Sequence, residues 1–309
     1  MKNKYFIITV DTEGDNLWKY KEGESIGVKN AEFLPRFQTL CEEFGFKPVY
    51  LTNYEMACSD CFVRDAQKWL NQDNCEIGVH LHAWNNPPLY KLDGPYCGNP
   101  YLIEYSTQKM FEKFDVIYTA ISNNFGIKPI SHRAGRWAMD NRYFKILEEY
   151  GIKVDCSFTP GIDWSSHKGK TMGGSNYKKV EKSARMIGNV LEVPITIVSS
   201  HMPYGGSLKH KIKTFFAGES IWLRTASSDF NMMKCCIDSI EKTQISDYVE
   251  FMIHSSEVMP GGSPYFPDKD SVERHFETMR RLFTYASERG FSGCTLQEYY
   301  NIYQKRTKV

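Results

Sequence analysis

Acidic and histidine side chains follow short apolar runs of the chain at the points where the runs end. Asp11 and Glu13 follow the first run, and His80 and His82 follow a later one. In an extended strand, residues two apart point to the same side, so each pair can turn toward one ion. One carboxylate and two histidines form a common zinc set with an open coordination position, where a water is acidified and attacks a carbonyl. The spacing therefore predicts a metal-dependent hydrolase.

Two further run ends carry residues that can support such a hydrolysis, namely Arg133 and His254. A carboxylate that does not bind the metal can take the proton from water, and a histidine on the far side can protonate the leaving group. Asp11 and His254 fit these parts, and Arg133 can pair with Asp11 and lower its pKa. We interpret His132, His167, His210 and His275 as structural or solvated, and His201 as a further site candidate.

Tryptophans follow several of these polar run ends within a few residues. They are Trp18, Trp84, Trp137 and Trp164. Flat aromatic faces stack on sugar rings, so their placement favours a carbohydrate substrate.

Short β-branched and aromatic runs alternate with amphipathic helical segments along the whole chain, which is typical of a parallel sheet with crossover helices. The carboxyl ends of such strands form one face, on which charged groups converge. We expect a single α/β domain over residues 1–309, with helices capped by Asn30, Ser106 and Asp140. The expected strands are Tyr5–Val10, Pro48–Leu51, Glu76–His82, Pro129–Arg133, Ile152–Ser157, Leu191–Val198, Val249–His254 and Phe291–Thr295.

Two long segments interrupt this alternation, at about 159–189 and 203–228. Long loops after strands shape substrate clefts in α/β folds, so these segments are candidates for specificity loops or, alternatively, peripheral insertions. A third loop, Met259–Tyr265, either contacts the substrate or is a tight turn.

Composition narrows the partners and the location. The formal net charge is +1, which gives no global field for nucleic acid. No run approaches the roughly 20 apolar residues of a membrane-spanning helix, and the start of the chain lacks the core of an export signal. The 9 cysteines are an odd number scattered over the chain, which favours reduced thiols. We therefore expect a cytoplasmic enzyme without membrane insertion; the oligomeric state is not predicted.

Taken in order, these motifs resemble those of the NodB-homology polysaccharide deacetylases, carbohydrate esterase family 4. The resemblance implies a distorted (β/α) barrel of seven strands and a divalent metal, commonly zinc. It makes Asp11 the general base, Glu13, His80 and His82 the ligands, Arg133 the tether of the base and His254 the general acid. It rests on the segments Thr9–Glu13, Glu76–His82, His132–Trp137, Asp155–Trp164 and Phe251–His254.

From the matching segments and their surroundings we expect substrate contacts from Trp84, Arg136, Trp137, Asp155 and Trp164. The chain departs from the family pattern at two positions. Thr12 stands where the family has a second aspartate, and Trp84 stands where it has a second histidine. With these departures the chain resembles a divergent branch of deacetylase-like proteins that is associated with surface-polysaccharide biosynthesis.

The expected function is removal of an acetyl group, N-linked in the leading hypothesis, from a sugar or polysaccharide precursor. Two alternatives stay open. One is a metal-dependent amidohydrolase that acts on a small amide or cyclic imide. The other is a non-catalytic carbohydrate-binding protein on a decayed deacetylase scaffold, which the altered metal motifs suggest.

Overall fold

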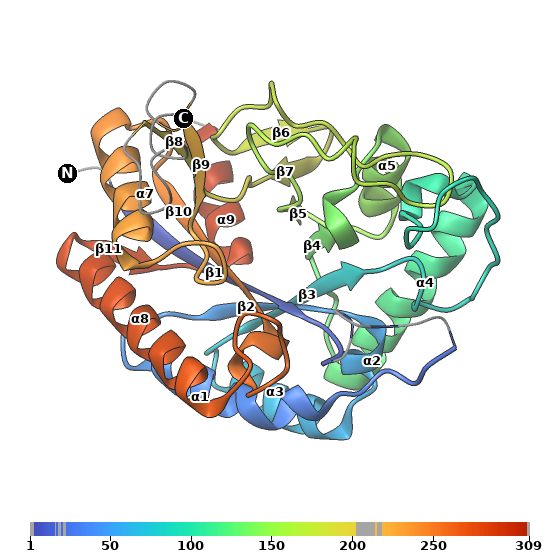
Figure 1. The fold of residues 1–309 in the computed structure, drawn as a ribbon, viewed down its shortest axis with the longest axis horizontal. Coiled ribbons are helices and arrows are strands. Elements are labelled where there is room, and N and C mark those ends of the chain that lie inside the picture. Colours follow the sequence, from blue (N-terminus) through green and yellow to red (C-terminus); the bar gives the residue numbers. More distant parts are fainter. Residues whose placement is uncertain are drawn as a thin grey trace.

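A curved sheet of parallel strands forms the centre of the fold (Figure 1). The computed structural model describes residues 3–15, 17, 20, 23–201, 214 and 218–307. Within these residues the neighbouring parallel strands follow the order β10-β1-β2-β3-β4-β5-β7. They are β1 (Lys4–Thr12), β2 (Pro48–Thr52), β3 (Glu76–Leu81), β4 (Ser131–Ala134), β5 (Val154–Asp155), β7 (Val190–Glu192) and β10 (Tyr248–His254). The expected α/β barrel-like fold class is confirmed.

Three further pairings complete the strand arrangement. β11 (Phe291–Gly293) pairs in parallel with the start of β1, and β6 (Arg185–Ile187) pairs antiparallel with β7. β8 (Ile197–Ser200) and β9 (Glu219–Trp222) form a separate antiparallel pair. The prediction of one strand over Leu191–Val198 is therefore wrong. Pro194 lies between the two halves and has no backbone N–H to donate to a ladder.

The segment between β7 and β8 links the two ends of the curved sheet. The Glu250 backbone N–H donates to Thr196 Oγ1 at 2.8 Å, and the Tyr248 hydroxyl donates to the Pro194 carbonyl at 3.0 Å. These contacts connect β10 to the chain segment that follows β7. The described strands do not form a continuous ladder between β10 and β7, as in a distorted barrel.

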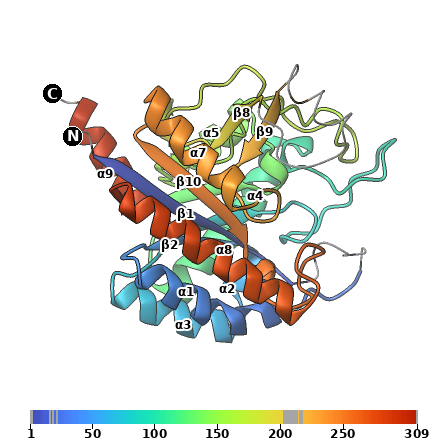
Figure 2. The ribbon, with the colours of Figure 1, turned by 60° about the vertical axis from the view of Figure 1, so that its left-hand side comes forward.

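Most helices cover the outer side of the sheet (Figure 2), whereas α9 (Leu296–Thr307) packs against the inner strand cluster through Leu296 and Tyr299. As expected, Ser106 and Asp140 cap the helices that follow them. Asn30 does not cap: it lies in the 3-10 turn η2 (Lys29–Phe33), and the next helix has Phe33 at its N-cap. None of the described helices is long and apolar enough to cross a membrane. The helices are α1 (Leu34–Glu42), α2 (Tyr54–Ala57), α3 (Asp60–Asn71), α4 (Thr107–Phe125), α5 (Asn141–Glu149), α7 (Phe230–Thr243), α8 (Lys269–Glu288) and α9 (Leu296–Thr307).

Alternation along β1 decides which of its side chains reach the site. Phe6, Ile8 and Val10 join the core cluster that includes the helices from α1 to α8, whereas Ile7 belongs to a second cluster with apolar residues of β2, β5, β7 and α9. Thr9 and Asp11 continue the series that Ile7 begins, because side chains alternate along a strand. The sheet interior therefore becomes polar toward the carboxyl end of β1.

Candidate active site

The candidate metal ligands lie at the carboxyl ends of parallel strands of one sheet. Asp11 is near the end of β1 and Glu13 directly follows that strand; His80 and His82 have the same relation to β3. β1 pairs with β10 so that Asp11 lies opposite His254, and β3 pairs with β4 so that His80 lies opposite Arg133. The sheet register thus brings to one edge side chains that are far apart in the sequence.

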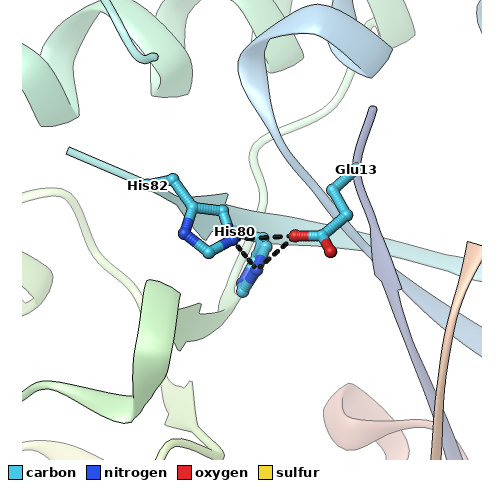
Figure 3. Close-up of side chains that lie close together, drawn as sticks. All are labelled: Glu13, His80 and His82. Atoms are coloured by element: carbon cyan, nitrogen blue, oxygen red, sulfur yellow. Dashed lines mark hydrogen bonds and ion pairs between the residues drawn. The ribbon is translucent and has the colours of Figure 1, made fainter. Parts of the chain in front are cut away.

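Glu13, His80 and His82 point toward one another and form a compact set of ligand atoms (Figure 3). Glu13 Oε2 lies 2.8 Å from His82 Nε2 and 3.5 Å from His80 Nε2. The two histidine Nε2 atoms are 3.0 Å apart. Ligand atoms around a tetrahedral zinc ion lie about 3.3 Å from one another, as bond lengths of about 2.0 Å require. The spacing of the three atoms fits a small divalent cation.

The tautomer of His80 also suits a metal ligand. His80 Nδ1 lies 3.0 Å from the backbone carbonyl oxygen of Arg133. A carbonyl only accepts, so Nδ1 carries the proton and the lone pair of Nε2 faces Glu13 and His82. Metal-binding histidines commonly have such a backbone partner, which fixes the ring. His80 is therefore oriented for coordination by the neighbouring strand.

Glu13 is held as an anion. Burial alone would raise the pKa of Glu13, but the polar contacts with His80 and His82 and the charge of His254 bring that pKa well below its usual value. The backbone of Glu13 is fixed as well. Its N–H donates to Ser255 Oγ at 3.0 Å, and its carbonyl accepts from Asn30 Nδ2 at 2.8 Å. Asn30, which we expected to cap a helix, thus supports this ligand.

Asp11 is anchored through one of its two carboxylate oxygens. Arg133, completely buried, donates from Nη1 to Asp11 Oδ1 at 2.7 Å and from Nη2 to Thr9 Oγ1 at 2.8 Å. Arg133 also forms a close ion pair with Glu250. Burial acts to raise the pKa of Asp11, but the charge of Arg133, followed by those of His80 and His254, lowers it below the usual value. Asp11 is therefore an ionised carboxylate with Oδ2 turned to the site.

His254 faces Asp11 and Glu13 with one nitrogen and a buried acid with the other. Its Nε2 lies 3.8 Å from Asp11 Oδ2 and 3.8 Å from Glu13 Oε1. Its Nδ1 lies 3.1 Å from Oε1 of Glu257, which also accepts from Arg224 Nη2 at 2.9 Å. Arg224 Nη2 also lies 2.9 Å from His254 Nδ1, so this ring nitrogen contacts both Glu257 and Arg224. The two residues together orient the ring so that Nε2 faces the site.

Glu257 remains ionised despite its burial. Burial alone would raise the pKa of Glu257, but the charge of Arg224 and the hydrogen bond from His254 lower this pKa to about 2. Sequence reasoning missed both partners. Glu257 follows His254 by three residues in the 3-10 turn η5 (Ser255–Val258), a position that could have been noticed, whereas Arg224 comes from the long segment 203–228. Many residues of that segment lie outside the described part of the chain.

A cavity of about 340 Å³ opens over these groups. Trp84, Arg136 and Trp137 line it, together with Asn99 and Arg224. The centroids of the Trp84 and His82 rings are 4.2 Å apart. Arg136 and Trp137 have positive φ angles of 55° and 61°, a strained backbone conformation of the kind that concentrates at functional sites. Both residues form one wall of the cavity.

Solved structures with the same architecture match the chain over nearly its whole length. A putative polysaccharide deacetylase from Mycobacterium smegmatis has a TM-score of 0.50 at 12% identity, and the match covers 96% of this chain and 94% of that one. The fold is that of a polysaccharide deacetylase. The fold expected from the NodB-homology resemblance is thereby confirmed. No protein-family model matches the chain, and no curated protein matches it in sequence.

Two further structures are similar to the chain. The 4-alpha-glucanotransferase from Thermococcus litoralis has a TM-score of 0.57 at 13% identity, with coverage of 97% of this chain and 40% of that enzyme. The chain therefore spans less than half of that longer protein. A family 4 carbohydrate esterase from Streptomyces lividans, solved in complex with acetate, has a TM-score of 0.45 at 9% identity, and the match covers 95% and 93% of the two chains.

Two residues expected to bind substrate do not line the cavity of this deacetylase fold. Asp155 is fully buried, and its Oδ1 lies 2.7 Å from His132 Nδ1 and 2.7 Å from Ser157 Oγ. The indole N–H of Trp164 donates to Thr159 Oγ1 at 2.8 Å. In this structure these polar atoms contact the protein itself and neither side chain lines the cavity, so the expected substrate contacts of Asp155 and Trp164 stay predictions.

The remaining candidates lie away from the cavity or outside the described residues. His201 is exposed and does not line the cavity, so the structure does not bring it to the candidate site. Trp18 and His210 lie outside the described residues.

Of the two roles expected for His275, structural or solvated, the structure shows the first. Its side chain is only 2% exposed, and the centroids of its ring and the Phe266 ring are 4.1 Å apart. The buried side of α8 includes position 275, since Val272, Phe276 and Met279 are buried on the same helix. Burial lowers the pKa of His275 to about 4, so the ring is neutral at neutral pH.

Proposed function

We propose that this chain is a metal-dependent hydrolase that removes an N-acetyl group from a sugar, with a surface-polysaccharide precursor as the substrate class. One observation carries the proposal. Next to the ligand atoms of Glu13, His80 and His82, a carboxylate oxygen of Asp11 and a nitrogen of His254 lie 3.8 Å apart and face the same cavity. A base and an acid beside a metal set are the groups that acetyl hydrolysis requires.

Glu13, His80 and His82 would hold the cation through one oxygen and two nitrogens. Such a donor set favours zinc among the common divalent ions. A bound cation would supply Lewis-acid polarisation of a carbonyl group and acidify water. The fixed tautomer of His80 and the ionised state of Glu13 support this assignment.

The protein residues supply the proton transfers. Asp11 Oδ2 can accept a proton from water, because Oδ1 is tied to Arg133 and the carboxylate is ionised. His254 can deliver a proton from Nε2 to the departing nitrogen, while Glu257 holds the opposite ring nitrogen. Trp84 and Trp137 border the same cavity and offer aromatic surface to a sugar ring.

Metal content and acetate release, measured together, test the proposal. We expect the purified protein to bind about one zinc per chain and to release acetate from members of a panel of N-acetylated and O-acetylated sugars. His80→Ala should lose both properties. His167→Ala is the matched control, because His167 is exposed and does not line the cavity. Full metal content and full activity in His80→Ala would contradict the proposal.

The same measurements separate the alternatives. Turnover of small amides or cyclic imides without acetate release would point to an amidohydrolase. Sugar binding by the wild-type protein with neither metal nor turnover would point to a non-catalytic scaffold.

A further inference from the structure

A second cavity, of about 370 Å³, is lined by the chain segment that directly follows one of the lining residues of the metal-site cavity. Arg224 lines the first cavity, whereas the residues that directly follow it, 225–229, line the second. The remaining walls are α8 and the loop that carries Tyr265 and Phe266. The Met259–Tyr265 loop, which we singled out for substrate contact, thus ends at this second cavity, and none of its residues lines the first.

The walls of the second cavity carry buried polar atoms without hydrogen-bond partners. His275 is the clearest case, since the side chain is only 2% exposed and neither ring nitrogen has a partner among the described residues. Thr225 Oγ1 is likewise buried and has no partner in the described part of the chain. Buried polar groups in folded proteins nearly always have a partner, because an unpaired one loses its hydration without compensation. Both residues belong to the lining of one open cavity, where an ordered water or a bound polar molecule would supply the missing partners.

We propose that this second cavity binds a saccharide unit. Its wall offers both donors and acceptors, since a neutral His275 supplies one of each and the hydroxyls of Thr225 and Ser227 supply both. The lining residues also include the cation Arg274 and the anion Asp229, which together suit a neutral polyhydroxylated molecule better than an anion. Tyr265, which is 49% exposed, offers an aromatic face to a sugar ring.

Arg224 directly precedes the segment that lines the second cavity, and it contacts the acid that holds His254, the candidate general acid. Its Nη2 donates to Glu257, which holds His254, while its Nε is buried and has no hydrogen-bond partner among the described residues. The second cavity nevertheless shares no described lining residue with the metal-site cavity. The inference therefore goes beyond the proposed function and would stand if the chain did not hydrolyse acetyl groups.

Sugar binding to the whole, metal-loaded protein tests the inference. Glucose, galactose and N-acetylglucosamine are titrated and followed by saturation-transfer NMR. We expect saturable binding of at least one of them. Thr225→Val and His275→Phe should each weaken it about tenfold, which corresponds to the loss of one hydrogen bond. Thr284→Val is the matched control, because Thr284 is exposed on the same helix and outside the cavity, and its binding should equal that of the wild type.

His80→Ala separates the two cavities in the same assay. Sugar binding that survives in His80→Ala and weakens in Thr225→Val supports the second site, and Thr225→Val decides the matter if His275→Phe does not fold. The inference is overturned if none of the three sugars binds saturably. It is also overturned if binding is unchanged in Thr225→Val, because the sugar then occupies only the metal-site cavity or another surface.

Discussion

The buried His275 predicts a specific dependence of stability on pH. Burial lowers the pKa of this histidine from 6.5 to about 4, so the folded protein keeps the ring neutral over a range in which the unfolded chain protonates it. Between pH 6.5 and pH 4 the unfolded state therefore binds more protons than the folded state. Stability rises with pH under that condition, so it should fall as the solution is acidified across this window.

The size of the effect follows from the pKa difference. Each unit of pKa shift corresponds to about 1.4 kcal/mol, so His275 should contribute a loss of about 3 kcal/mol in the free energy of unfolding on acidification from pH 6.5 to pH 4. Below pH 4 the folded state also protonates and the contribution levels off. A loss of this size is a large fraction of the net stability of a typical domain.

Urea unfolding of the wild type and of His275→Phe, measured across this pH range, isolates the contribution. Titrating groups remote from His275 affect both proteins alike, so the difference between the two free energies carries the His275 part together with its interaction with Glu257. The wild type should lose about 3 kcal/mol more than the variant between neutral pH and pH 4. His167→Phe, a change at an exposed histidine, should run parallel to the wild type. Parallel curves for the wild type and His275→Phe would refute the assignment of a buried, unpaired ring.

Three substitutions in the candidate site have distinct expected outcomes. Asp11→Asn should lower acetate release by about 10²- to 10⁴-fold while metal content, measured by elemental analysis, stays at the wild-type level, because the base is lost and the ligands remain; full activity would exclude Asp11 as the base. Glu257→Gln should lower the hydrolysis of N-acetyl sugars about 10²-fold, yet spare an activated aryl acetate whose leaving group needs no proton; equal losses on both substrates would contradict a role through His254. Glu13→Asp shortens the carboxylate reach by about 1.5 Å, so competition with a chelator should show weaker zinc binding; unchanged affinity would remove Glu13 from the ligand set.

The positions of the main site residues could be predicted because each ends an apolar run. A run that is buried on both faces continues until the sheet reaches its edge, so the first ionisable residues after it mark that edge. Asp11, His80, Arg133 and His254 all follow this rule. Asp155 follows it too and still lies outside the cavity, because the rule gives the end of a strand but not the depth of the side chain.

The supporting residues could not be predicted in the same way. Asn30 contacts Glu13 from a 3-10 turn, and its sequence neighbourhood is equally compatible with a helix cap. Arg224 reaches Glu257 from a segment without a periodic pattern. In both cases the contact depends on how a turn or loop folds back over the strand ends, and such long-range placement leaves no periodic signal in the sequence.

Each of the two departures from the family pattern is compensated by a nearby residue of the same strand end, Glu13 in one case and His82 in the other. Thr12 donates its hydroxyl to the Val10 carbonyl at 3.0 Å, and alternation along β1 turns it away from Asp11, so a ligand at that position would face the wrong side. Glu13 stands on the same side as Asp11 because residues two apart in extended chain share a side, and its side chain is one carbon longer. His82 has the same relation to His80, and Trp84 packs against the His82 ring instead of supplying a ligand. In both ligand pairs, therefore, the two side chains share a side because side chains alternate along extended chain. The site also depends on the pairings of β1 and β3 with β2, which fix residues 11–13 and 80–82 relative to each other.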